Sequence, residues 1–246
     1  MRNNIFRNGK TMILAYDQGF EHGPVDFNKK NVDPQYIFDI AIEGGYDAIA
    51  VQAGIAKHYY KGSNTRVPLV VKLNAKTRFD NKDPISKQHT SVKHAASLGA
   101  VGVGYTIYLG SSHEQEMFKE FAKICEEAHD YGLTAICWMY PRGKSIKDEF
   151  DKKTLAYGAR IAMELGADIV KLKYNGSMED TKWVVDSAGK CKVVIAGGNK
   201  VDEAEFLNMV KEVLSAGAVG LAVGRNVWQS DRPLALSREL MRLLHP

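Results

Sequence analysis

The chain has 246 residues, of which 45% are hydrophobic and 25% are charged. This balance is typical of a globular domain with a large apolar core, and it excludes a disordered or fibrous protein. The formal net charge of +4 is mild and the charges form no long run, so we expect no nucleic-acid partner.

Apolar runs of strand length alternate with amphipathic stretches of helix length, a pattern typical of a parallel α/β fold. We predict eight strands, at Met12–Asp17, Ala48–Gln52, Pro68–Asn74, Val101–Tyr108, Thr134–Tyr140, Ile169–Tyr174, Val193–Ala196 and Val219–Gly224. We predict helices at Pro34–Glu43, Ile85–Leu98, Glu114–Tyr131, Lys153–Leu165, Asp202–Ala216 and Pro233–Leu244. Eight such units favour a closed (β/α)8 TIM barrel, and because no low-complexity linker interrupts them we predict one domain over residues 1–246.

Four segments repeat a pattern in which glycine ends a helix just before a strand: SLGAVGVGY, ELGADIVKL, SAGAVGLAV and EGGYDAIAV. Glycine in this place fits a left-handed C-cap that leads into a short loop. We interpret the repeat as structural.

The C-terminal ends of the strands are where a TIM barrel carries its chemistry. The first strand ends in AYDQGFEHGP, where Asp17 shares a face with Ile13 and Ala15 and is predicted to point into the barrel. Asp17 could therefore act as an acid or base, although an N-cap or turn role is the alternative. His22 follows, either as a ligand contact or as a turn residue.

The third and fifth strands offer further candidates. Lys72 is a possible nucleophile without a second lysine beside it, and Asn74 could bind a substrate hydroxyl. The fifth strand reads TAICWMYPRG, in which Trp138 and Tyr140 share one face. We predict that Trp138 fills the barrel, that Tyr140 acts as a general acid/base at its mouth, and that Arg142 meets a phosphate above it.

The stretch DIVKLKY places two lysines in a strand that otherwise has the composition of a buried one. Alternation puts Ile169, Lys171 and Lys173 on one face. If that face is the barrel interior, Lys173 lies near the mouth and Lys171 about 7 Å below it. Two neighbouring, partly desolvated amines lower each other's pKa, and a neutral amine can attack a carbonyl to form a Schiff base. The alternative is two lysines that reach solvent or a carboxylate.

The seventh and eighth strands lead into glycine-containing turns, VVIAGGNK and LAVGRNVW. The loops after these two strands commonly form the phosphate site of a barrel, because backbone N–H groups can close on an anion there. With Arg225 in the second turn, the pair predicts a phosphate-binding site.

The remaining motifs argue against metal and disulfide chemistry. Cys125, Cys137 and Cys191 are far apart with no C-x-x-C pair, which indicates a reducing compartment. The histidines have no H-x-x-x-H spacing, so we expect no metal and no other cofactor. Because the N-terminus lacks a signal-like apolar core and no apolar run approaches 18 residues, we expect a cytoplasmic protein with no membrane partner.

Five of these motifs together resemble a known family. AYDQGFEHGP, WMYPRG, DIVKLKY, IAGGNK and VGRN occur in the order, and at the strand ends, found in the archaeal-type class I fructose-1,6-bisphosphate aldolases. That family also includes aminodeoxyheptosonate-forming transaldolase-like enzymes and an autoinducer thiolase. The similarity covers nearly the whole chain, and WMYPRG and KLKY are its specific parts.

The resemblance implies roles for individual residues. Lys173 would form the Schiff base, Tyr140 would be the general acid/base, and Asp17 would assist at the hydroxyls or the carbinolamine. The phosphate of the dihydroxyacetone half would be held by Gly197, Gly198, Gly224 and Arg225. Further substrate contacts would come from Trp138, Lys171, His22 and, at the distal phosphate, Arg142.

The implied function is reversible cleavage of fructose 1,6-bisphosphate to dihydroxyacetone phosphate and glyceraldehyde 3-phosphate. Transaldol transfer or thiolysis on another phosphorylated substrate is one alternative, and a non-catalytic sugar-phosphate-binding barrel is another. A zinc-dependent class II aldolase is a third, against which the histidine spacing argues. The resemblance also suggests a homo-oligomer, with a decamer as one candidate.

Overall fold

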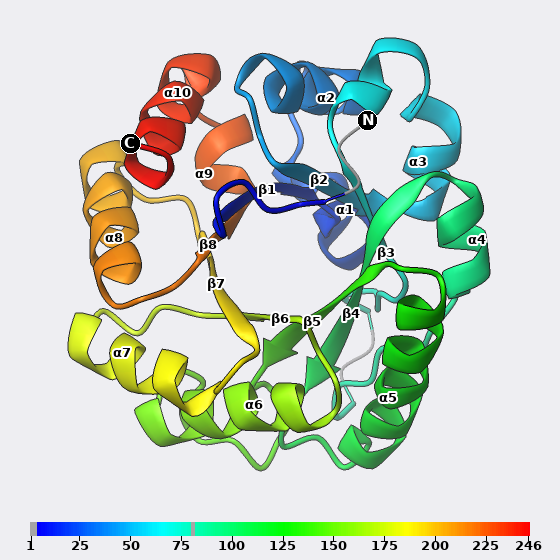
Figure 1. Cartoon of the computed structure of the whole chain (residues 1–246), viewed down its shortest axis with the longest axis vertical. Helices are drawn as coiled ribbons and strands as arrows, with labels where there is room; N and C mark the ends of the chain where they lie inside the picture. The colour runs from blue at the N-terminus through cyan, green and yellow to red at the C-terminus, as the bar shows by residue number, and fades with distance from the viewer. Residues whose placement is uncertain (1–3, 80–81) are drawn as a thin grey trace.

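A computed structural model describes residues 4–79 and 82–246. Eight parallel strands close into a barrel in chain order, β1 to β8, and the helices surround it (Figure 1). The strands are β1 Thr11–Tyr16, β2 Ala48–Gln52, β3 Leu69–Lys72, β4 Ala100–Tyr108, β5 Thr134–Tyr140, β6 Ile169–Leu172, β7 Lys192–Ala196 and β8 Gly220–Val223. The predicted (β/α)8 barrel is confirmed, and each predicted strand is present.

Each strand is followed by at least one helix, and the last strand is followed by two. They are α1 Gln18–His22, α2 Pro34–Glu43, α3 Ala53–Tyr59, α4 Val92–Ser97, α5 Glu114–Asp130, α6 Lys152–Glu164, α7 Met178–Ser187, α8 Glu203–Ser215, α9 Arg225–Trp228 and α10 Pro233–Leu244. Two short 3-10 helices are η1 Gly23–Asp26 and η2 Gly62–Arg66. In the described ranges, no helix is both long enough and apolar enough to cross a membrane.

The two faces of each strand pack against different surroundings. On β6, Ile169 belongs to a cluster inside the barrel, whereas Val170 and Leu172 belong to the larger cluster under the helices. Lys171, between them, shares the face of Ile169 and therefore points inward. The predicted alternation along this strand is confirmed, and it places a cation inside an otherwise apolar barrel.

Glycines end the helices where the repeat predicted them. Gly45, Gly99, Gly166 and Gly217 have φ angles of 74°, 83°, 96° and 98°. Only glycine adopts this left-handed conformation without steric strain. These residues stop α2, α4, α6 and α8 and turn the chain directly into the next strand.

The predicted helix at Ile85–Leu98 is wrong in its first half, because α4 begins only at Val92. The backbone N–H groups of His89 and Thr90 donate to the carbonyl of Leu73 at the end of β3. Because these N–H groups donate to Leu73, they are not available for the i to i−4 hydrogen bonds of a helix. Ser91 then caps α4 by accepting a hydrogen bond from the N–H of His94.

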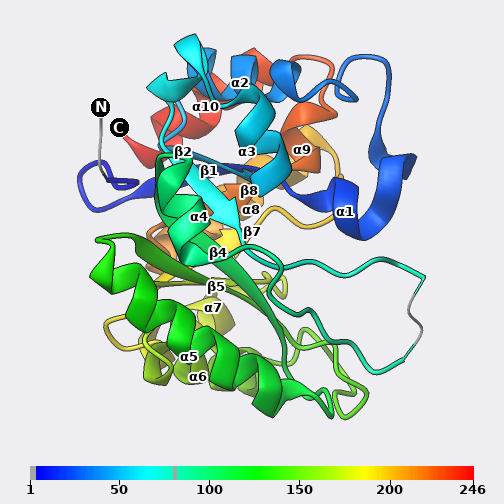
Figure 2. The same ribbon diagram turned by 90° about the vertical axis from the view of Figure 1, so that its right-hand side faces the viewer.

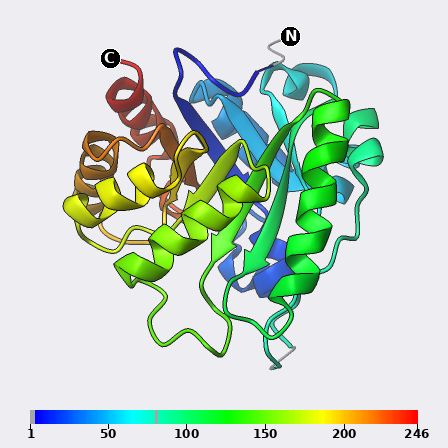
Figure 3. The same ribbon diagram turned by 60° about the horizontal axis from the view of Figure 1, so that its bottom comes forward.

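The C-terminal ends of the strands lie at one end of the barrel, together with α1. Figure 2 shows α1 on the opposite side of the molecule from the C-terminus. Figure 3 shows the connection between β5 and α6 projecting from the barrel at its lower edge. The residues that were expected to carry chemistry therefore gather at one end.

We predict that Gly104→Ala destabilises the barrel. A Cβ atom at Gly104 on β4 would lie 2.0 Å from the ring of Trp138 on β5, so the buried indole would have to shift. Overpacking of this kind lowers the free energy of unfolding by about 1–3 kcal/mol, or a few degrees in Tm. The matched control is Gly54→Ala in α3, where a Cβ meets nothing within 4 Å. Thermal unfolding should show an unchanged or higher Tm for the control, and equal Tm values for both variants would contradict the prediction.

Candidate active site

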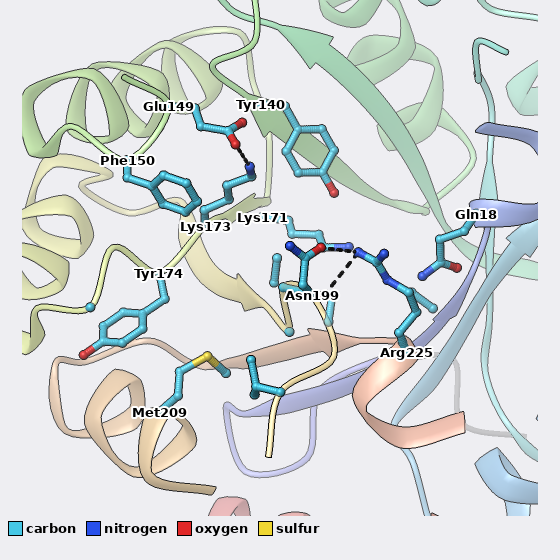
Figure 4. Close-up of a pocket in the computed structure, with 18 of the residues that line it drawn as sticks. Gln18, Tyr140, Glu149, Phe150, Lys171, Lys173, Tyr174, Asn199, Met209 and Arg225 are labelled. Carbon is cyan, nitrogen blue, oxygen red and sulfur yellow. Dashed lines mark hydrogen bonds and ion pairs between the residues drawn. The ribbon is translucent and has the colours of Figure 1, made fainter. Parts of the chain in front are cut away.

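A cavity of about 910 Å³ opens at the C-terminal ends of the strands (Figure 4). Its volume falls in the range of small-molecule sites. Trp138, Lys72 and Asn74 do not line it, whereas the other predicted site residues do: Asp17, His22, Tyr140, Arg142, Lys171, Lys173, Gly197, Gly198, Gly224 and Arg225. The structure therefore brings together side chains and backbone from the ends of β1, β5, β6, β7 and β8.

Lys171 lies at the base of this cavity. It is 6% exposed, and its strand partner on β5 is Trp138. Its Nζ lies 5.3 Å from the centroid of the Trp138 ring, which offers only a weak cation–π contact. Burial lowers the pKa of Lys171 to about 8, since desolvation disfavours the charged form; Asp17 opposes this shift and Lys72 adds to it. A fraction of the amine is therefore neutral and nucleophilic near pH 7.

Lys173 follows the last residue of β6 and lies closer to the cavity opening. Its Nζ is 2.5 Å from Oε1 of Glu149 and 4.7 Å from the centroid of the Phe150 ring. Partial burial lowers the pKa of Lys173, while the hydrogen bond to Glu149 acts in the opposite direction. The carboxylate stabilises the ammonium form in the position seen here, so the geometry favours Lys171 over Lys173 as the nucleophile.

The two lysines start from different heights in the barrel. Successive inward residues of a strand are separated by roughly 7 Å along its axis. Lys171 is paired with Trp138, one inward layer below Tyr140, and its four-carbon stem is long enough to span much of the distance between layers. Lys173 starts from this upper layer, and its amine instead meets the β5–α6 connection.

Tyr140 and Asp17 line the same cavity as Lys171, and the charge of Asp17 acts on both Lys171 and Tyr140. Burial raises the pKa of the Tyr140 phenol well above its ordinary value, and the charges of Asp17 and Glu21 raise it further. The phenol is therefore protonated at neutral pH and available as a hydrogen-bond donor. Asp17 precedes α1, but its side chain makes no capping hydrogen bond. The carboxylate is thus not engaged in the N-cap role that was its alternative prediction.

Trp138 and Lys72 lie beneath the cavity. Trp138 is 1% exposed and fills the barrel, as expected from the sequence. Lys72 is also buried, and its Nζ donates to the backbone carbonyl of Asn74 at 2.9 Å. The proposed hydroxyl-binding role of Asn74 is wrong: the residue is fully buried, and its amide bonds to the backbone of Ser86 and Thr106.

The turns after β7 and β8 form the opposite wall of the cavity. Gly198 has a φ of 71°, and a Cβ at Gly224 would lie 2.6 Å from Nε2 of Gln18, so side chains are disfavoured at both positions. Arg225 donates to Oδ1 of Asn199 at 3.0 Å. Its Nε is buried and has no hydrogen-bond partner within the described residues. Gly197 and Gly224 are buried and Gly198 is exposed, so the backbone of Gly198 and the guanidinium of Arg225 are the candidates here for contact with a phosphate.

Several residues of the cavity were not predicted. Gln18 and Asn199 lie inside the motifs AYDQGFEHGP and IAGGNK. Because each directly follows a predicted site residue, the sequence could have indicated both as cavity residues. Glu149 and Phe150 lie in an irregular connection, where no periodicity indicates which side chains point inward. Within residues 4–79 and 82–246, no cluster of His, Cys, Asp or Glu could hold a metal ion.

Comparison with known proteins agrees with this geometry. The family model for "DeoC/LacD family aldolase" matches residues 11–230. The chain belongs to the DeoC/LacD aldolase family. Within this aldolase family it is similar to the class 1 fructose-bisphosphate aldolases of Thermoproteus tenax, at 48% identity over 97% of this chain and 91% of the relative, and of Halobacterium salinarum, at 46% identity over 94% and 89%.

A solved structure of an aldolase provides a further comparison. An archaeal fructose-1,6-bisphosphate aldolase, whose catalytic lysine is covalently bound to the carbinolamine intermediate of the substrate, superposes with a TM-score of 0.93 at 47% identity. The match covers 97% of this chain and 95% of that one. The barrel and its strand order are therefore those of an aldolase that works through a covalent lysine intermediate.

We predict that Lys171 reacts with an amine-acylating reagent in a pH-dependent way that reflects its lowered pKa. Only the neutral amine reacts, so its acylation rate should rise as the pH increases and level off above about pH 8. Ordinary exposed lysines continue to gain reactivity up to about pH 10.4. Peptide mass spectrometry can follow Lys171 and the exposed Lys119 in the same sample. Parallel profiles for the two residues would contradict a depressed pKa.

Proposed function

We propose that this chain is a class I fructose-bisphosphate aldolase that forms its Schiff base on Lys171. The observation that carries the proposal is a buried lysine with a lowered pKa at the base of a cavity, beneath a protonated tyrosine. The relatives with 46% and 48% identity are class 1 fructose-bisphosphate aldolases. Together these findings favour aldol cleavage of fructose 1,6-bisphosphate into dihydroxyacetone phosphate and glyceraldehyde 3-phosphate.

The first chemical step is attack by the neutral amine of Lys171 on the C2 carbonyl of the open-chain sugar. The Tyr140 phenol donates a proton to the developing carbinolamine oxygen, because its raised pKa keeps it protonated. Loss of water from the carbinolamine then gives an iminium ion. The pKa of about 8 makes this addition possible near neutral pH.

Cleavage of the C3–C4 bond follows from the iminium. The electron pair of that bond moves toward the positively charged nitrogen and leaves an enamine in place of a free carbanion. The C4 hydroxyl must lose its proton as the aldehyde forms, and Asp17 or the tyrosinate of Tyr140 can accept it. Protonation of the enamine at C3 and hydrolysis of the resulting iminium release dihydroxyacetone phosphate and restore the lysine.

The phosphate contacts orient the sugar along the cavity. The turns of β7 and β8, with Gly197, Gly198, Gly224 and Arg225, are our candidates for the phosphate next to the reacting carbonyl. Arg142 at the other wall is our candidate for the distal phosphate. Nδ1 of His22 donates to Oδ2 of Asp26 at 2.9 Å. The residue lines the cavity, where a hydroxyl contact is the role we propose. Homo-oligomerisation and a cytoplasmic location stay predictions.

Borohydride trapping tests the proposal directly. Reduction in the presence of dihydroxyacetone phosphate should attach the ligand to Lys171, because the reductant converts the iminium into a stable secondary amine. Peptide mass spectrometry locates the adduct. The matched variants are Lys171→Met, which should abolish adduct and turnover, and Lys173→Met, which should retain the adduct on Lys171. An adduct on Lys173 in the wild-type chain would restore the prediction made from the sequence.

We predict that Tyr140→Phe lowers kcat by roughly 10²-fold with a small change in KM, which is typical when a general acid/base is lost. The phenyl ring keeps the packing against Arg142, whose guanidinium lies 4.7 Å from the ring centroid. Steady-state kinetics with fructose 1,6-bisphosphate provide the measurement. An unchanged kcat would remove Tyr140 from the mechanism.

The same experiments separate the alternative functions. Transaldol transfer or thiolysis would also give a lysine adduct, but the turnover of a substrate panel would then favour another phosphorylated compound. A non-catalytic sugar-phosphate-binding barrel would show ligand-induced stabilisation with neither adduct nor turnover. The lowered pKa of Lys171 favours catalysis, because a binding lysine serves best when it is fully charged.

A further inference from the structure

One carboxylate forms ion pairs with two cations at the cavity opening. Glu149, in the connection between β5 and α6, has its Oε1 2.5 Å from Nζ of Lys173 and its Oε2 3.2 Å from Nε of Arg142. Its side chain is 33% exposed, so solvent screens the pairs only in part. All three residues line the cavity. The cations that face the substrate on this wall are therefore paired within the protein.

The position of this cluster matches one end of the proposed substrate. In Figure 4, the pair Glu149–Lys173 and the guanidinium of Arg225 lie on different sides of the cavity, and Lys171 and Tyr140 lie between them. A sugar with a phosphate at each end, bound across the reacting amine, would therefore place one phosphate toward Arg225. Its second phosphate would be directed toward Lys173.

A phosphate and a carboxylate compete for such a cluster. Guanidinium and ammonium groups bind both anions through the same N–H donors. A phosphate dianion brought next to Glu149 would experience like-charge repulsion. The carboxylate must therefore leave Lys173 and Arg142 before a distal phosphate can contact both of them.

We propose that Glu149 is an internal competitor for the distal phosphate and sets the discrimination between bisphosphorylated and monophosphorylated sugars. In the free protein it holds Arg142 and Lys173, and a sugar that carries a second phosphate displaces it. Glu149 thus determines specificity without touching the reacting atoms. This inference rests on the proposed aldolase function and adds the role of a residue that the sequence did not indicate.

The test compares Glu149→Gln with a matched control in the same connection. The amide keeps the size of the side chain but removes the charge that competes with phosphate. Asp148→Asn removes one negative charge nearby; Asp148 is exposed, and its Oδ1 accepts from the N–H of Phe150, which an amide oxygen can also do. The readout is the ratio of kcat/KM for fructose 1,6-bisphosphate to kcat/KM for fructose 1-phosphate.

Glu149→Gln should raise this ratio about three- to tenfold, mainly through a lower KM for the bisphosphate, because breaking a partly exposed ion pair is modestly unfavourable. Asp148→Asn should leave the ratio unchanged. In the background Lys173→Met, the effect of Glu149→Gln should shrink, since one partner of the carboxylate is already absent.

Other outcomes overturn the inference. A lower ratio in Glu149→Gln would mean that the carboxylate orients the two cations for phosphate binding. An equal fall of kcat for both substrates would give Glu149 a part in the chemistry, and an unchanged ratio would leave it a structural ion pair. If neither sugar is cleaved by the wild-type chain, the proposed function fails instead, and borohydride trapping reports that failure separately.

Discussion

The burial of Lys171 inside the barrel is the constraint on which the site depends. A lysine on an inward-facing position of β6 loses most of its hydration, and the loss falls on the charged form of the amine. The surroundings compensate only in part: the charge of Asp17 and the face of the Trp138 ring favour the ammonium form, whereas the positive charge of Lys72 disfavours it. A strong ion pair at this position would return the pKa toward its ordinary value and remove the nucleophile. The site therefore requires a buried amine on which desolvation outweighs the nearby carboxylate of Asp17.

Lys173, two residues after Lys171, differs from it because its ammonium group forms a close ion pair. Lys173 emerges above the end of β6, where the β5–α6 connection supplies Glu149. Two lysines on the same face of one strand therefore differ in their surroundings, because Lys173 lies one layer higher in the barrel than Lys171. In our proposal the lower amine carries out the covalent chemistry, and the upper one is held as a cation that an anionic ligand can reach.

The sequence predicted the barrel well because strand alternation and helix-ending glycines are local features. It also named ten of the residues that line the cavity, since the C-terminal ends of parallel strands must converge. It placed the Schiff base on Lys173, whereas we propose Lys171, because the choice depends on a carboxylate from a segment with no periodicity. The helix predicted from Ile85 failed for a similar reason: the backbone of His89 pairs with Leu73, a contact that local pattern does not reveal.

The segment that carries Glu149 is fixed at both of its ends. Near β5, the N–H of Gly143 donates to the carbonyl of Leu109 at 2.9 Å, and a Cβ at Gly143 would collide with the backbone of Gly110. At the other end, Asp151 caps α6 by accepting from the N–H of Thr154 at 2.8 Å. Between these anchors, Glu149 can leave its partners through a side-chain rotation or a short local shift. Because neither anchor lies on β6, such a movement leaves the position of Lys171 unchanged, and substrate discrimination can be adjusted separately from the covalent chemistry.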